Sequence, residues 1–150
     1  MFKHILVPTD GSQIAEHAAA RAIDLAHSVG AGITAVHVSP QFHVFTYRSA
    51  MLEETRGEHE RDAEVHATGY LDRVRRAAVE RGVSCDVVRT VGDNVAHSIM
   101  QVAMERGCDL IVMGSHGRHG LGGMLLGSQT QRVLGESAIP VLVCRGSGTS

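Results

Sequence analysis

Two kinds of hydrophobic pattern alternate along the chain. Short β-rich runs, typical of strands in a parallel sheet, occupy residues 3–9, 32–39, 83–91, 108–114 and 140–145. Between them, apolar residues recur every three or four positions, which predicts helices at 12–29, 53–81, 94–106 and 128–136. The order βαβαβαβαβ predicts an open parallel α/β sheet with right-handed crossovers and helices on both faces.

The predicted helices carry boundary signals and separate faces. Gly30 and Gly107 follow the last apolar positions of two helices and are natural C-terminal stops. The charged helix 53–81 has an apolar side made of Ala63, Ala67, Tyr70, Leu71, Val74 and Ala78. Its arginines lie at helical spacing beside acidic residues, which indicates a solvated face rather than a phosphate track.

Composition narrows the class of protein. A chain of 150 residues with 43% hydrophobic content predicts one domain, residues 1–145, followed by a flexible tail, 146–150. Its three scattered cysteines indicate neither a disulfide framework nor a zinc site. No apolar run approaches the length of a membrane span. We therefore expect a cytoplasmic protein that does not act at a membrane.

The charge balance argues against nucleic acid as a partner. The chain has 14 basic and 16 acidic residues, a formal net charge of −2, and a single lysine, Lys3. Proteins that bind nucleic acid usually carry a basic stripe, and this sequence lacks one.

Two loops have the composition of a ligand site. In open parallel sheets, ligands bind at the carboxyl ends of the strands, where the winding of the chain reverses. Residues 8–12 follow the first strand with Pro-Thr-Asp-Gly-Ser, and the glycine-rich residues 114–128 follow the fourth. If the first and fourth strands are neighbours, as in the strand order 3-2-1-4-5, these two loops face each other.

The glycine-rich segment has two readings from its residues alone. Gly114 and Gly117 permit a tight turn with exposed amides, while Gly127 and Ser128 stand where the next helix begins. Free amides beside a helix N-terminus favour phosphate, although a flexible connector has the same composition. Ser128 and Gln131 also match a capping box, in which the serine hydroxyl satisfies the helix start. No lysine follows the last glycine, so the segment is not a Walker A loop.

The segment Gly114-x2-Gly117-x9-Gly127-Ser128 resembles the nucleotide signature of the universal stress protein family. The resemblance extends to "HILVPTDGS" at the start, "AVHV" in the second strand, "DLIVMGSHGR" in the fourth and "IPVLV" in the fifth, which together cover nearly the whole chain. It implies a Rossmann-like fold of the adenine nucleotide alpha hydrolase type. The complete glycine spacing is the mark of the family's ATP-binding branch, as opposed to the branch that dimerises without ATP.

The resemblance also implies roles for residues. Asp10 would lie beside the nucleotide and its Mg²⁺ or Mn²⁺, and the backbone of Val38 would meet adenine. Arg118, the only cation of the loop besides histidine, would complement the phosphates, and His116 either contacts the ligand or is exposed. The full implied nucleotide site consists of Pro8, Thr9, Asp10, Val38, Met113, Gly114, Ser115, His116, Gly117, Arg118, Gly127, Ser128 and Gln129.

The fifth strand predicts a homodimer. In the order 3-2-1-4-5 it is an edge, and an apolar edge invites pairing with another chain. The resemblance agrees, and it implies an interface through Val141, Leu142 and Val143.

Three functions follow as alternatives. The first is an ATP-binding regulatory or sensor module in stress response, the second a slow metal-dependent ATPase, and the third a dimeric interaction protein without nucleotide. The sequence shows no nucleophile paired with a base, and the close histidine pairs His116 with His119 and His59 with His66 lack a third ligand nearby. Binding without efficient turnover is favoured, and AMP and cyclic nucleotides are not distinguished from ATP.

Overall fold

A computed structural model of the chain describes residues 1–41, 49–116 and 126–146, with side chains described from residue 57 onward in the second range. Gly117, Arg118, His119 and the tail residues 147–150 lie outside the described residues, as do residues 42–48. The strands are β1 (His4–Pro8), β2 (Gly32–Ser39), β3 (Cys85–Val91), β4 (Leu110–Gly114) and β5 (Val141–Cys144). The helices are α1 (Gln13–Val29), α2 (Ser49–Glu80), α3 (Val95–Glu105) and α4 (Ser128–Glu136).

The five strands form one parallel sheet in the order β3-β2-β1-β4-β5, which confirms the predicted fold and strand order. β1 lies at the centre, with Ile5 beside both Ile33 of β2 and Leu110 of β4. The chain winds outward from β1 to β3 and then returns to β4. The carboxyl ends of β1 and β4 are therefore adjacent at the point where the winding reverses.

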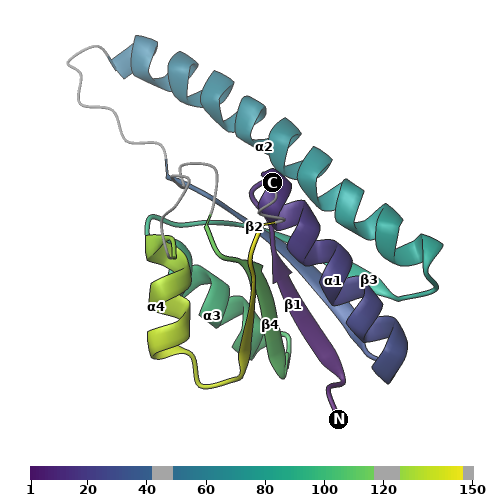
Figure 1. Cartoon of the computed structure of the whole chain (residues 1–150). Helices are drawn as coiled ribbons and strands as arrows, with labels where there is room; N and C mark the ends of the chain where they lie inside the picture. The colour runs from purple at the N-terminus through teal and green to yellow at the C-terminus, as the bar shows by residue number, and fades with distance from the viewer. Residues whose placement is uncertain (42–48, 117–125, 147–150) are drawn as a thin grey trace.

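Helices cover both faces of the sheet (Figure 1). One core cluster joins side chains of α1 and α2 to β1 and β2, among them Ala22, Leu71 and Ile33. The other cluster joins α3 and α4 to the opposite face, with Ile99 and Val133 packed near Val36. Because Ile33 and Val36 belong to different clusters, the alternate side chains of β2 point to opposite faces of the sheet.

Local signals set the boundaries of α1. The Ser12 hydroxyl accepts a hydrogen bond from the Ala15 N–H at 3.2 Å and caps the helix start. Gly30 follows the helix with φ +74°, and its N–H donates to the Ala26 carbonyl oxygen. This left-handed conformation is accessible to glycine, so the predicted stop at Gly30 is confirmed.

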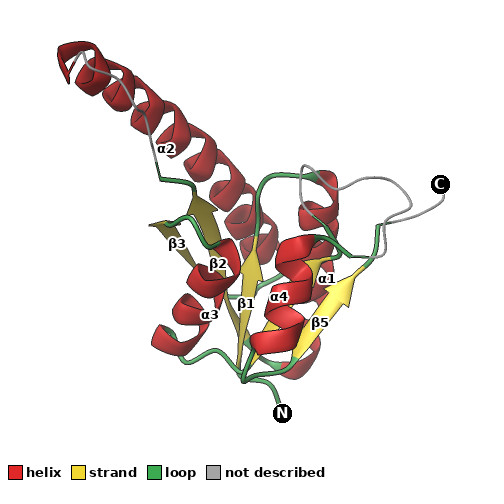
Figure 2. Cartoon of the chain, turned by 90° about the vertical axis from the view of Figure 1, so that its left-hand side faces the viewer, coloured by secondary structure: helices red, strands yellow, loops and turns green. Residues whose placement is uncertain are grey.

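The longest helix, α2, packs against α1. Its N-terminal end extends past the sheet (Figure 2). Ala67, Leu71, Val74 and Ala78 are buried against the sheet, as the predicted apolar side requires. No helix among the described residues is both long and apolar enough to cross a membrane.

Candidate functional site

A cavity of about 740 Å³ opens at the carboxyl ends of β1, β2 and β4. Its volume lies within the usual range for small-molecule sites. The cavity is lined by residues from the loop after β1, the end of β2, the face of α2, the start of α3 and the junction between β4 and α4. The loop after β1 and the described ends of the glycine-rich segment therefore meet at the switch point of the sheet.

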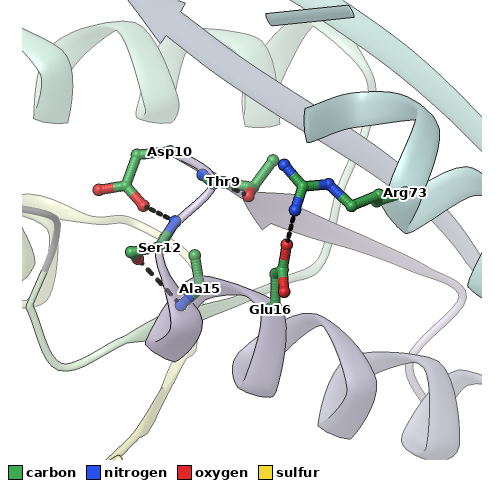
Figure 3. Close-up of polar contacts among 7 residues, drawn as sticks. Thr9, Asp10, Ser12, Ala15, Glu16 and Arg73 are labelled. Atoms are coloured by element: carbon green, nitrogen blue, oxygen red, sulfur yellow. Dashed lines mark hydrogen bonds and ion pairs between the residues drawn. The ribbon is translucent and has the colours of Figure 1, made fainter. Parts of the chain in front are cut away.

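The loop after β1 is held by hydrogen bonds at every residue (Figure 3). Thr9 is buried; its N–H donates to the Val36 carbonyl oxygen at 2.8 Å, and its own carbonyl oxygen accepts from His37 Nδ1 at 2.8 Å. Asp10 lines the cavity, and its Oδ1 accepts the Ser12 N–H at 3.0 Å. These bonds fix the Asp10 carboxylate at the entrance to α1.

The β4–α4 junction requires close approach of two backbone segments. The Gly127 N–H donates to the Ser115 carbonyl oxygen at 2.7 Å. A Cβ placed on Gly127 would lie 3.0 Å from the His116 Cα. At Gly114, at the end of β4, a Cβ would lie 3.0 Å from the Ile14 Cγ1, a side-chain atom, and 3.3 Å from the Ile14 carbonyl oxygen. A side chain at either glycine would therefore require its neighbour to shift by a few tenths of an ångström.

The start of α4 corrects one sequence interpretation. The N-cap is Gly127, not Ser128, and no side chain among the described residues caps the helix. Ser128 is the first helical residue, and the Gln131 Nε2 donates to the Leu126 carbonyl oxygen instead of completing a capping box. The capping-box reading is therefore wrong. The first amides of α4 have no partner within the helix, and Ser128, Gln129 and Thr130 line the cavity.

Gln129 has a structural role that the sequence did not indicate. Its Oε1 accepts the Ala96 N–H at 3.0 Å, at the start of α3. This bond ties the N-termini of α3 and α4 together beside the cavity. In the same region the Thr130 hydroxyl donates to the Gly114 carbonyl oxygen at 2.9 Å, which joins α4 to the end of β4.

One wall of the cavity comes from α2 and was missed by sequence reasoning. His59, Asp62, Ala63, His66 and Tyr70 line the cavity at helical spacing. They lie on the same face of α2 as the buried apolar residues, but nearer the N-terminus of the helix. There the polar residues His59, Asp62 and His66 accompany the apolar ones. The change from apolar to histidine and aspartate along one helix face is the signal that could have marked this wall.

Tyr70 is the centre of a ring cluster within this wall. Its ring packs edge-on against His37 at a centroid distance of 5.4 Å and stacks with His66 at 6.2 Å. The Arg73 guanidinium lies 5.5 Å from the Tyr70 ring centroid and pairs with Glu16 of α1 at 2.6 Å (Figure 3). The Tyr70 ring also lies directly over Gly11, leaving no room for a side chain there. The cluster thus fixes α2 against the β1 loop.

The cavity gathers most of the predicted nucleotide residues. It is lined by Pro8, Thr9, Asp10, Val38, Met113, Gly114, His116, Gly127, Ser128 and Gln129. Ser115 does not line it; this residue is buried, and its Oγ lies 3.3 Å from the His116 Nδ1. Gly117 and Arg118 fall outside the described residues. Among the described residues no three histidine, cysteine or acidic side chains group as metal ligands.

Comparison with known proteins gives a consistent result. The model of the universal stress protein family matches residues 1–145. Universal stress protein YxiE of Bacillus subtilis is 32% identical over 153 residues, covering 97% of this chain and all of YxiE. Universal stress protein Rv2005c of Mycobacterium tuberculosis is 34% identical over 143 residues, and the chain spans 45% of its length.

Solved structures share the fold. The protein MJ0577 of Methanocaldococcus jannaschii is 29% identical, with a TM-score of 0.83 and 99% of both chains covered. A universal stress protein solved in complex with cAMP is 22% identical with a TM-score of 0.72, and one from Archaeoglobus fulgidus in complex with dAMP is 20% identical with a TM-score of 0.69. At these last identities the likeness is one of fold. The family match and the curated relatives together establish that this chain belongs to the universal stress protein family.

Proposed function

We propose that the protein is an ATP-binding regulatory module whose nucleotide sits in the cavity at the carboxyl ends of β1, β2 and β4. The observation that carries the proposal is the convergence on one cavity of the α4 N-terminus, which no described side chain caps, two close-packed glycines and a fixed carboxylate. Family members solved with cAMP and dAMP support an adenine nucleotide as the class of ligand.

The phosphates would lie at the β4–α4 junction. The first residues of α4, Ser128, Gln129 and Thr130, line this part of the cavity, and the positive end of the helix dipole favours an anion there. No lysine or arginine among the described residues lines the cavity. Charge complementarity therefore falls to the amides, to the histidines and, by proposal, to Gly117 and Arg118.

The nucleoside would lie toward β2. Val38 and Met113 line the cavity together with Val95 and Ile99 of α3, and they provide an apolar surface of the kind that a purine ring covers. The predicted adenine contact through the Val38 backbone fits this side. β2 runs one residue beyond Val38, to Ser39.

The described residues fit a divalent ion carried by the triphosphate. Mg²⁺ in nucleotide sites is usually held by one or two carboxylates together with phosphate oxygens. Asp10 supplies one fixed carboxylate at the cavity. Mg²⁺ or Mn²⁺ would neutralise part of the phosphate charge, and Asp10 would orient it.

Binding with little turnover is the proposed activity. Efficient hydrolysis requires cations that stabilise the transferring phosphoryl group, and no lysine or arginine among the described residues lines the cavity. The proposal includes a homodimer through the edge strand β5 and action in the cytoplasm, where the free cysteines Cys85, Cys108 and Cys144 would stay reduced.

Metal dependence and phosphate release test this proposal. Fluorescent ATP should bind in Mg²⁺ with an affinity that falls in EDTA, and phosphate release should match that of a Gly127→Val control. Equal affinity in EDTA would contradict the metal role. Phosphate release well above the control would replace the regulatory module with an ATPase.

A further inference from the structure

The side chain of Ser39 is buried beside the cavity and ends in a polar hydroxyl. Ser39 is 2% exposed, and its Oγ has no partner among the described residues. Its backbone carbonyl oxygen accepts the Gly92 N–H at 2.9 Å, so the backbone is satisfied. The residue is nevertheless among those that line the cavity. Buried polar groups are normally hydrogen-bonded, and an exception calls for a cause.

The position of Ser39 separates it from the phosphate end of the cavity. It ends β2, and β1 lies between β2 and β4 in the sheet. Two strand spacings amount to about 10 Å. The glycines and the α4 amides that would take the phosphates follow β4, so Ser39 faces the opposite end of a bound nucleotide.

The surroundings of Ser39 are those of the α2 wall. Alternate side chains of β2 point to the same face, so Ser39 shares the face of His37, whose ring contacts Tyr70. Val38, between them, packs with the cluster on the other face. This part of the cavity combines the rings of His37 and Tyr70 with the buried Ser39 hydroxyl. A hydrogen bond from a ligand to a buried hydroxyl is stronger than one formed in water.

We propose that the Ser39 hydroxyl is a ligand-contacting group that hydrogen-bonds the nucleoside half of the bound nucleotide. A serine hydroxyl both donates and accepts, so it can pair with a donor or an acceptor on the nucleoside. This inference rests on the proposed nucleotide function and assigns a specificity contact within it. It adds a residue outside the glycine signature to the site.

The test compares Ser39→Ala with Thr34→Val. Thr34 is also a buried hydroxyl of β2, but it lies away from the cavity, and its Oγ1 is paired with His4 Nε2 at 2.5 Å. Each variant and the wild type are titrated with ATP and with inorganic tripolyphosphate, both in excess Mg²⁺, and the thermal unfolding midpoint of the ligand-free proteins is measured.

Ser39→Ala should lose roughly 3- to 10-fold in affinity for ATP, the usual worth of one hydrogen bond. Its affinity for tripolyphosphate should not change. Its ligand-free unfolding midpoint should equal or exceed that of the wild type, because no bond within the protein is lost. Thr34→Val should do the reverse, with a lower midpoint and unchanged ATP affinity.

Three results would overturn the inference. Unchanged ATP affinity in Ser39→Ala would show that the hydroxyl does not touch the ligand. An equal loss for tripolyphosphate would place it at the phosphates or indicate a general disturbance. A lower unfolding midpoint would show that it has a partner in the free protein. In each case wild-type ATP binding would still stand, whereas failure of the wild type to bind ATP would remove the proposed function and this inference together.

Discussion

The N–H of Gly127 donates to the carbonyl oxygen of Ser115 at 2.7 Å, and this bond brings the start of α4 onto the end of β4. Because the two segments are so close, a side chain on Gly127 would point at the backbone of His116. The geometry of the proposed phosphate site therefore depends on a hydrogen bond and on the absence of a side chain at one residue.

Gly127→Ala should impair binding and stability together. The new Cβ would lie 3.0 Å from the His116 Cα, so the two backbone segments must move apart. We expect a loss of about 1–3 kcal/mol in the free energy of unfolding, the usual cost of overpacking, and at least a tenfold loss of ATP affinity. Chemical denaturation and calorimetry would measure the two effects.

Gly135→Ala is the matched control within the same helix. A Cβ at Gly135 meets nothing within 4 Å. This variant should gain about 0.5–1 kcal/mol of stability, because alanine favours the helix, and should bind ATP as the wild type does. Normal ATP affinity in folded Gly127→Ala would show that the close approach is not needed for the ligand.

Gly11→Ala should disturb α2 as well as the β1 loop. Gly11 has φ +77°, and its Cβ would overlap the Tyr70 ring. Gly30 has φ +74° with open space around it, so Gly30→Ala introduces the strain of a left-handed backbone without a steric clash. We expect Gly11→Ala to be the less stable variant on thermal unfolding. Equal losses in the two variants would mean that the Tyr70 contact contributes nothing.

Much of the fold follows from sequence, because its elements have strong local signals. The helix at 128–136 and the strand at 32–39 agree with the observed bounds, and glycines mark the ends of α1 and α3. The cap of α4 was placed one residue late, since cap identity depends on the extended backbone of Gly127 and not on residue type alone.

Some residues of the candidate site could be assigned from the sequence and others could not. Residues of the β1 loop and the glycine signature could be assigned because loops at a switch point are the eligible positions. The α2 wall was not assigned. The change from apolar to polar residues along its face is a sequence signal, but His66 and Asp62 look like solvated helix positions until the packing of α2 over β2 is known. Ser39 was missed for a related reason: its burial and its unpartnered Oγ are properties of the folded chain.

The edge strand β5 leads to a prediction on assembly. Leu142 is 42% exposed on β5, whereas Val141 packs against the core, so a charge at Leu142 tests the interface without opening the core. The proposed homodimer predicts a dimeric wild type and a monomeric Leu142→Asp variant in analytical ultracentrifugation. Val87→Asp is the control, at a residue 39% exposed on the opposite edge strand β3. A dimer that persists in Leu142→Asp would contradict an interface through β5.

Asp109 should make stability depend on pH in the acid range. Partial burial acts to raise the pKa of this carboxyl, but hydrogen bonds from the Lys3 N–H at 2.9 Å and the His4 N–H at 3.1 Å hold it below the ordinary 3.8. A depressed pKa in the folded state means that the contribution to stability is complete above about 3.8 and is lost as the pH falls through the folded value.

Asp109→Asn should therefore lower the stability near neutral pH and flatten its decline below pH 3.8. Urea unfolding at several pH values would show both effects. Asp86→Asn, at an exposed carboxylate of β3, is the comparison for the removal of one negative charge. If the free energy of unfolding falls as steeply with decreasing pH in Asp109→Asn as in the wild type, this carboxyl is not the source of the acid dependence.

The central claim is that the cavity binds ATP. The most direct measurement is a calorimetric titration of nucleotide-free protein with ATP in excess Mg²⁺. The account predicts saturable binding near one nucleotide per chain, lost in Gly127→Val. No detectable heat at several temperatures, in protein shown to carry no nucleotide beforehand, would contradict it and leave a universal stress protein that acts without ATP.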